Sequence, residues 1–332
     1  MNSDQTPLQS RPLSAARRAA LRTAATWALG GALAGCAEPV PPLRVGSIVF
    51  PGYELPFLAR EKGWLDEREV RLVEMLSNTD TLRALAAGQL EAAMLTLDEM
   101  LSARADGVNL RAVLILDVSH GADVVLARPP LTLRELAGRR VAVEDSAGGA
   151  IMLSALLAAA GLPIEQVRKV SFTLDRSVDH YRQQQADFII TVEPWASQLE
   201  RQGARRVFDS TRIPGRIVDV LAVRADAAQR QASAVRHLVA AHFRAQEYWL
   251  RDPEQAATLM AARLQMGAGD VPQAFRGLQL LDVQDNRAWM RPDGRLAATL
   301  QDLQRAMLHD ALLQRIAGVA DIADPAYLPE GL

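Results

Sequence analysis

Short apolar runs alternate along the chain with stretches whose apolar residues recur at helical spacing. Most runs end in a turn rich in Gly, Pro, Ser, Asn or Asp, and many of these turns lead into a helix-like stretch. Repeated strand, turn and helix is typical of an α/β fold. We expect strands near 43–49, 70–75, 88–94, 111–117, 124–127, 141–143, 167–174, 187–192, 203–209 and 217–223, and helices up to Gly63, near 81–87, from 96–98, near 131–138, 150–160 and 178–184, and over most of 225–332.

The stretch 141–150 lies between two similar halves of the chain. Its apolar residues predict a short buried strand, and the turn 145–149 predicts the start of a helix near Ala150. Either Ser146 or Asp145 can cap that helix. The N–H groups at a helix start also suit a small polar or anionic ligand group, although the same pattern occurs in α/β folds without a ligand.

Polar and aromatic residues gather in the turns that follow the predicted strands. In a parallel sheet the carboxyl ends of the strands face the ligand crevice, so these turns hold the candidate binding residues. Some have an ordinary structural alternative: Phe50 and Tyr53 can pack their turn, and Trp195 can belong to the core. Either Ser77 or Asp80 can cap a helix. The candidates are Phe50, Tyr53, Glu54, Ser77, Asn78, Thr79, Thr96, Asp98, Asp117, Ser119, Asp123, Glu144, Ser146, Gly148, Glu193, Trp195 and Asp219.

Two extended segments are expected to cross between two lobes. The apolar run 111–117 is interrupted by a polar kink at 117–123 and resumes at 124–127, which suggests a first crossing. The run 217–223, which contains Asp219, suggests the return. We therefore assign 43–121 and 222–332 to the first lobe and 122–221 to the second.

The first 42 residues have the pattern of an export signal and a tether. Arginines precede an uncharged stretch, 23–35, which is too short to span a bilayer. It ends in Leu-Ala-Gly before Cys36, as in a bacterial lipobox, and Arg17-Arg18 resembles a twin-arginine signal. We expect 1–35 to be removed, Cys36 to be lipidated, and the proline-containing segment 36–42 to tether the protein to a membrane at its periplasmic face. The alternative is a buried N-terminal helix with a free thiol.

Charge and cysteine content narrow the function. The net charge of -2 and a pI near 6.2 provide no basic field for nucleic acid, so we expect a small-molecule partner. The single cysteine excludes an intrachain disulfide and a cysteine-based metal cluster. The five histidines show no metal-ligand spacing, and no nucleophile elbow, dinucleotide fingerprint or P-loop occurs. We expect no enzyme, no cofactor and no metal site.

Several short motifs, taken in order, resemble a known family. They are PGYEL at 51–55, LAREKG at 58–63, TLRALAAG at 81–88, LAGRRVAVE at 136–144, Glu193-Pro194, and Phe208-Asp209-Ser210 through Pro214-Gly215. The chain after Pro42 resembles substrate-binding proteins of ABC transporters, of the nitrate, sulfonate, taurine and thiamine-precursor (SsuA/THI5-like, NMT1) type.

The resemblance implies an α/β fold of the type II-like periplasmic-binding-protein kind. Each lobe would be a mixed sheet flanked by helices, with two hinge segments crossing between the lobes. A monomer would close around its solute and deliver it to a permease with an ATPase subunit.

The charge of the predicted turns departs from what an anion-binding member would need. They carry Glu54, Asp98, Asp117, Asp123, Glu144, Glu193 and Asp219 and no Arg or Lys. An anion enclosed among them would be repelled by several kcal/mol. We expect instead a neutral or cationic ligand such as an aminopyrimidine, stacked on an aromatic ring.

Three alternatives remain. The ligand can be nitrate, a sulfonate or a taurine-like anion if the carboxylates cap helices or pair with arginines outside the turns. The protein can be a sensor that presents its solute to a membrane receptor. An enzyme like the fungal thiamine-precursor synthases would need a cysteine-rich motif, which this chain lacks.

Overall fold

The computed structural model describes residues 40–330, and one compact unit begins at Pro41. The predicted signal 1–35, the lipidated Cys36 and most of the tether lie outside the described residues. Within 40–330 no helix is long and apolar enough to cross a membrane.

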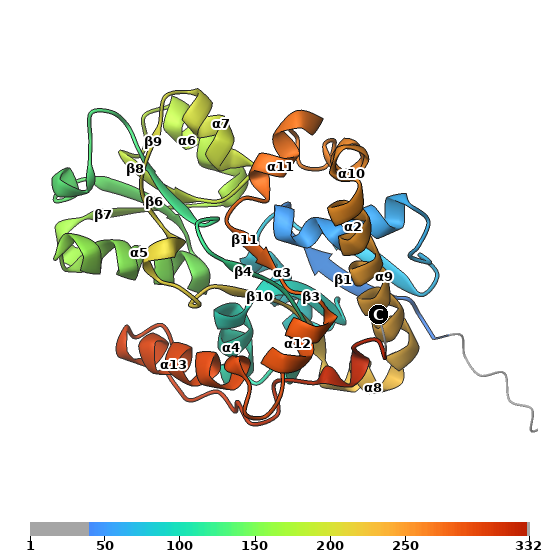
Figure 1. Cartoon of the computed structure of the whole chain (residues 1–332). Helices are drawn as coiled ribbons and strands as arrows, with labels where there is room; N and C mark the ends of the chain where they lie inside the picture. The colour runs from blue at the N-terminus through green and yellow to red at the C-terminus, as the bar shows by residue number, and fades with distance from the viewer. Residues whose placement is uncertain (1–39, 331–332) are drawn as a thin grey trace, which may run out of the picture. The chain divides into compact units, whose positions relative to one another are not determined.

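The first of two sheets has six strands in the order β11-β4-β10-β3-β1-β2 (Figure 1). Strand β1 pairs in parallel with β2 and β3, whereas β10 runs antiparallel to β3 and β4, and β11 antiparallel to β4. The strands are β1 (Leu43–Ser47), β2 (Val70–Glu74), β3 (Ala92–Thr96), β4 (Leu110–Ser119), β10 (Val218–Arg224) and β11 (Leu278–Leu280).

The second sheet has five strands in the order β7-β6-β8-β5-β9. Strand β6 pairs in parallel with β7 and β8, and β5 runs antiparallel to β8 and β9. The strands are β5 (Val124–Ala127), β6 (Arg140–Glu144), β7 (Arg168–Phe172), β8 (Phe188–Thr191) and β9 (Arg205–Asp209). Two mixed sheets confirm the predicted two-lobe α/β class.

Helices connect the strands and form most of the C-terminal part of the chain (Figure 1). They are α2 (Glu54–Glu61), α3 (Asn78–Ala86), α4 (Leu97–Ala105), α5 (Ala147–Ala160), α6 (Ser177–Arg182), α7 (Trp195–Arg201), α8 (Ala225–Arg230), α9 (Ala232–Arg251), α10 (Pro253–Met260), α11 (Val271–Ala274), α12 (Val283–Trp289) and α13 (Arg295–His309). Helix α5 is apolar almost all round because it packs on β6 and β8 and also against α4.

Two segments cross between the sheets, as the sequence predicts, but the return crossing precedes the predicted run 217–223, which is largely β10 of the first sheet. One joins β4 to β5 and the other joins β9 to β10. They are tied together by the hydroxyls of Ser119 and Ser210, which lie 2.7 Å apart and are both buried. The Ser210 hydroxyl also accepts the N–H of Gly121, and the Ser119 hydroxyl accepts that of Asp123 at 3.3 Å. The crossing point is therefore one hydrogen-bonded unit.

Several predicted element limits are wrong for local reasons. The central helix begins at Ala147 and not near Ala150, because Ser146 caps it and the two glycines join its first turn. Helix α3 likewise begins at Asn78, directly after its cap, whereas residue 81 was expected. The third strand spans 92–96 because 88–91 form the turn before it.

Two further differences concern longer segments. The expected helix 131–138 is a single 3-10 turn, Leu133–Glu135, closed by a capping box between Thr132 and Glu135. The C-terminal part also contains β11, which pattern analysis missed. A strand of three residues has no usable periodicity, and β11 exists because it pairs with the edge of β4.

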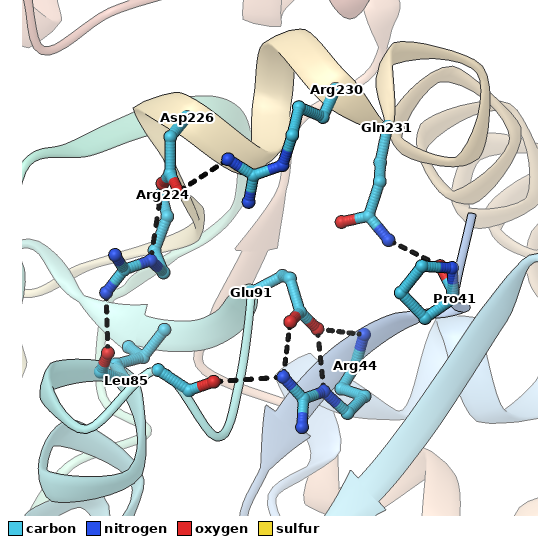
Figure 2. Close-up of polar contacts among 9 residues, drawn as sticks. Pro41, Arg44, Leu85, Glu91, Arg224, Asp226, Arg230 and Gln231 are labelled. Atoms are coloured by element: carbon cyan, nitrogen blue, oxygen red, sulfur yellow. Dashed lines mark hydrogen bonds and ion pairs between the residues drawn. The ribbon is translucent and has the colours of Figure 1, made fainter. Parts of the chain in front are cut away.

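Charged contacts hold the amino ends of the first sheet's parallel strands (Figure 2). Arg44 of β1 forms an ion pair with Glu91, which precedes β3, and donates to the carbonyl of Gly88 at 2.9 Å. Arg224, at the end of β10, donates to the carbonyl of Leu85 at 2.9 Å. These arginines lie at the strand ends opposite to the turns that carry the candidate binding residues.

Candidate ligand-binding cavity

A cavity of about 550 Å³, partly open to solvent, lies between residues of the two sheets. Its wall includes residues that follow the carboxyl ends of β1, β6 and β8, which is where ligands bind in α/β sheets. The lining residues are Ile48, Phe50, Tyr53, Asn78, Thr96, Glu99, Asp123, Glu144, Ser146, Gly148, Gly149, Met152, Leu174, Ile190, Thr191, Val192, Ile217 and Asp219.

Nine of the seventeen candidate residues lie in this wall. They come from the first sheet, the second sheet and the crossing segments, and are Phe50, Tyr53, Asn78, Thr96, Asp123, Glu144, Ser146, Gly148 and Asp219. Phe50 and Tyr53 contact each other edge to face, with ring centroids 5.1 Å apart. Both alternatives for these two rings therefore hold, since they pack their turn and also line the cavity.

Three of the other candidates serve the backbone around the cavity. Ser77 caps α3 by accepting the N–H of Asp80 at 3.1 Å, as one alternative predicted. Ser119 belongs to the crossing point. Thr79 donates to the carbonyl of Asp145 at 3.1 Å and so joins the start of α3 to the turn after β6.

Two candidates from the predicted acidic set have partners of their own. Glu54 is buried and forms an ion pair with Arg263, which also contacts Glu74 at 2.9 Å. Glu193 accepts hydrogen bonds from the N–H and hydroxyl of Ser197, at 3.1 and 2.8 Å, in the first turn of α7. Neither carboxyl reaches the cavity wall.

Three candidates lie next to the cavity. Asp98 and Asp117 are fully buried close behind its wall. Asp117 lies so close to Gly52 that a Cβ at that glycine would come within 2.1 Å of its Oδ2. Trp195, half-buried, lines a second hollow with Leu76 and Glu144. Glu144 borders both spaces.

The wall also contains residues that the sequence analysis did not single out. Glu99 is the most consequential, because its Oε2 accepts the N–H of Thr96 at 3.1 Å while its carboxyl also lines the cavity. The T-x-x-E spacing at 96–99 was a visible capping signal. The apolar lining residues, such as Met152 and Ile190, are not distinguishable in sequence from core.

A buried carboxyl pair forms one side of the site. Asp219 and Asp117 lie directly opposite each other on β10 and β4, and the Tyr53 hydroxyl donates to Asp219 at 2.6 Å. Burial, and then the neighbouring Asp117 charge, raise the pKa of Asp219 well above its ordinary value. Burial also raises the pKa of Asp117 to about 7, so the pair retains a proton near neutral pH.

The pKa values of the remaining carboxyls around the cavity are also raised. Burial raises the pKa of Asp98 and of Glu144 to about 7, and that of Asp123 to about 6. Burial, followed by the charges of Asp98 and Glu144, raises the pKa of Glu99 well above its ordinary value. Near neutral pH some of the carboxyls around the cavity are therefore protonated, and a positive charge bound among them would displace those protons.

No Lys or Arg of residues 40–330 lines the cavity, so its wall carries no positive charge. Three acceptor atoms of buried side chains in the wall have no hydrogen-bond donor within 40–330: Asn78 Oδ1, Glu99 Oε1 and Glu144 Oε1. In the same residues no group of three or more His, Cys, Asp or Glu side chains could hold a metal ion. The wall thus offers acceptors to a ligand that brings donors.

The chain belongs to the NMT1-like family, whose model matches residues 36–264. No curated protein sequence matches the chain. Its fold is that of the periplasmic binding proteins. One similar structure is the alkanesulfonate-binding protein SsuA from Xanthomonas axonopodis pv. citri bound to MOPS, with 19% identity and a TM-score of 0.71, over 86% of this chain and 99% of that one.

Two further structures have the same fold. The periplasmic aliphatic sulphonate-binding protein SsuA from Escherichia coli shares 18% identity, with a TM-score of 0.70, over 88% of this chain and 95% of that one. The ligand-binding component of an ABC-type import system from Staphylococcus aureus, with zinc bound, shares 12% identity, with a TM-score of 0.72, over 87% and 98%.

Proposed function

We propose that this protein is the solute-binding component of an ABC importer and not an enzyme. It captures a small molecule between its two lobes and delivers it to a membrane permease. The observation that carries the proposal is the cavity itself, which has walls from both sheets next to the two crossing segments. A solute held there contacts both lobes, so its binding energy favours the closed arrangement.

The similar structures support this role. Two of them are sulfonate-binding periplasmic proteins, and a third is the ligand-binding component of an ABC-type importer. The pattern at 17–36 supports export and lipidation at Cys36, which would anchor the mature protein to a membrane at its periplasmic face.

The charge of the wall supports a neutral or cationic ligand. Carboxyls of Glu99, Asp123, Glu144 and Asp219 line the cavity, and no described Arg or Lys balances them. A nitrate or sulfonate there would lack the charged donors that hold such groups.

The test uses residues 37–332, which are the mature chain without its lipidated Cys36. Thermal unfolding is followed with aminopyrimidines, amines, amides, sulfonates and nitrate. A ligand at 100 times its dissociation constant should stabilise by about 2.7 kcal/mol, a shift of several degrees. Uptake of the stabilising solute should then require both this chain and a permease. Failure of all solutes to bind, or conversion of a bound solute into a product, would contradict the proposal.

A further inference from the structure

Three of the four buried atoms of the cavity wall that lack a partner within 40–330 are amide or carboxyl oxygens, and the fourth is the Thr96 hydroxyl, which can accept as well as donate. Asn78 Oδ1, Glu99 Oε1 and Glu144 Oε1 accept hydrogen bonds and cannot donate them when the carboxyls are ionised. All three side chains are more than nine-tenths buried. Leaving buried acceptors unpaired is costly, so once the carboxyls are ionised a solute that carries donors at several positions is favoured over one that carries none.

These acceptor atoms belong to elements of both lobes. Asn78 and Glu99 belong to α3 and α4 of the first lobe, whereas Glu144 ends β6 of the second. Asp219 lies in the wall from β10, and Asp123 from the segment between β4 and β5. A single donor group cannot serve all of them.

Apolar side chains occupy the rest of the wall. Ile48, Met152, Leu174, Ile190 and Ile217 surround the space between the polar groups, beside the ring of Phe50. This lining suits a short hydrocarbon or aromatic frame that separates the donors.

We propose that the cavity selects a small organic cation with N–H donors at two or more positions, an amine or amidine on an apolar frame, which binds by displacing protons from the surrounding carboxyls. The inference rests on the proposed function, since it specifies the solute class of the same site. The proposed function allows a neutral or a cationic solute, and the inference selects the cationic one.

Proton displacement follows from which groups face the bound charge. They are Asn78, Glu99, Asp123, Glu144 and Asp219 in the wall, the Tyr53 hydroxyl, and Asp98 and Asp117 behind it. Burial raises the pKa of Asp98, Asp117 and Glu144 to about 7 and that of Asp123 to about 6. A bound cation favours their ionised forms, so each displaced proton leaves for solvent.

The predicted pH dependence has a definite sign. Below about pH 7 the cation must remove protons, and its affinity rises by up to about tenfold per pH unit for each proton released. Above that pH the carboxyls are increasingly ionised beforehand and the dependence weakens. An anion would show the opposite trend, because it binds better when the carboxyls are protonated.

The experiment is calorimetric titration of the mature chain with 1,4-diaminobutane, agmatine and benzamidine, and with methanesulfonate and nitrate as anionic probes. Titrations between pH 5.5 and pH 8, in buffers of different ionisation enthalpy, measure affinity and proton release together. We expect at least one cation to bind, with proton release at pH 6 and an affinity that increases toward pH 8.

The variants Glu99→Gln and Glu144→Gln test the site from the two lobes. Glutamine at 99 can still accept the Thr96 N–H and so keeps the cap of α4. Each variant should weaken cation binding about 10- to 100-fold, the effect of losing one charge-assisted hydrogen bond. The matched control is Glu165→Gln, an exposed glutamate outside the cavity, which should bind as the parent does.

The outcomes separate this inference from the proposed function. Binding of an anion or of an uncharged solute, with no cation bound, overturns the inference and leaves the solute-binding function standing. Cation binding without proton release, or unaffected by both variants, also overturns it. Binding of none of the cations overturns it too, and binding of no solute in any class removes the proposed function with it.

Discussion

Gly148 and Gly149 both lie in the first turn of α5, but replacing each of them by alanine should change the stability of the protein in different ways. Gly149 lies against the end of β6, where an added Cβ would come within 2.4 Å of the Glu144 carbonyl oxygen and 2.9 Å of a Val143 methyl. At Gly148 the nearest atom to an added Cβ, Asp98 Oδ2, is 3.7 Å away, an ordinary contact. Only Gly149→Ala forces the helix away from the strand.

The magnitude follows from the clash and the helix propensity. A carbonyl oxygen is part of the backbone and cannot rotate aside, so α5 must move by at least about 0.6 Å to reach the 3.0 Å limit of real Cβ contacts. Overpacking of this kind costs about 1–3 kcal/mol, and the gain in helix propensity offsets at most about 1 kcal/mol. We expect Gly149→Ala to lower the free energy of unfolding by about 1–2 kcal/mol.

Urea unfolding of the mature chain without ligand measures the effect, with Gly148→Ala as the matched control. The control should be neutral or slightly stabilising, because alanine gains helix propensity without a clash. Its Cβ would point into the cavity wall, so solute affinity is measured separately. If Gly149→Ala is as stable as the parent, or if both variants lose the same amount, the steric reasoning is refuted.

Two further predictions concern buried charge. Arg263→Met leaves the buried Glu54 without its partner and should cost about 3–5 kcal/mol, largely recovered by adding Glu54→Gln; no recovery would contradict the pairing. The raised pKa values, about 7, of Asp98, Asp117 and Glu144 stabilise the ligand-free protein below their unfolded pKa of about 4, and this contribution is lost as the pH rises through 7. Urea unfolding should therefore show a loss of at least about 1 kcal/mol between pH 5 and pH 8, and a gain would refute it.

Contacts between the lobes close part of the cavity. Besides the Thr79 to Asp145 hydrogen bond, Ser154 of α5 donates to Asp310, which follows α13, at 2.7 Å. The two lobes are thus in direct contact at the turn before α5 and along α5 itself. A solute that binds in the cavity is shielded from water, which strengthens its contacts with the carboxyls.

Local patterns were sufficient for the order of most elements and for half of the cavity. Strands, caps and turns are short-range features, so a few neighbouring residues narrowed each cap to two candidates, of which Ser77 and Ser146 are the caps in the structure. Turns after parallel strands meet at one edge of a sheet, which explains why nine candidates lie in one wall. Glu99 was not among the candidates. Its carboxyl both caps α4 and lines the cavity, and the T-x-x-E spacing indicates only the cap.

The sequence by itself determined the α/β class, the excess of acidic residues in the turns and the resemblance to the NMT1-like family. Only the tertiary structure decided which carboxyls surround the cavity. Arg263 neutralises Glu54 from 209 positions away, and Asp117 meets Asp219 only through the antiparallel register of β4 and β10. Such pairings depend on which strands and helices become neighbours, and a local pattern of hydrophobic and polar residues carries no information about a partner that is distant in the chain.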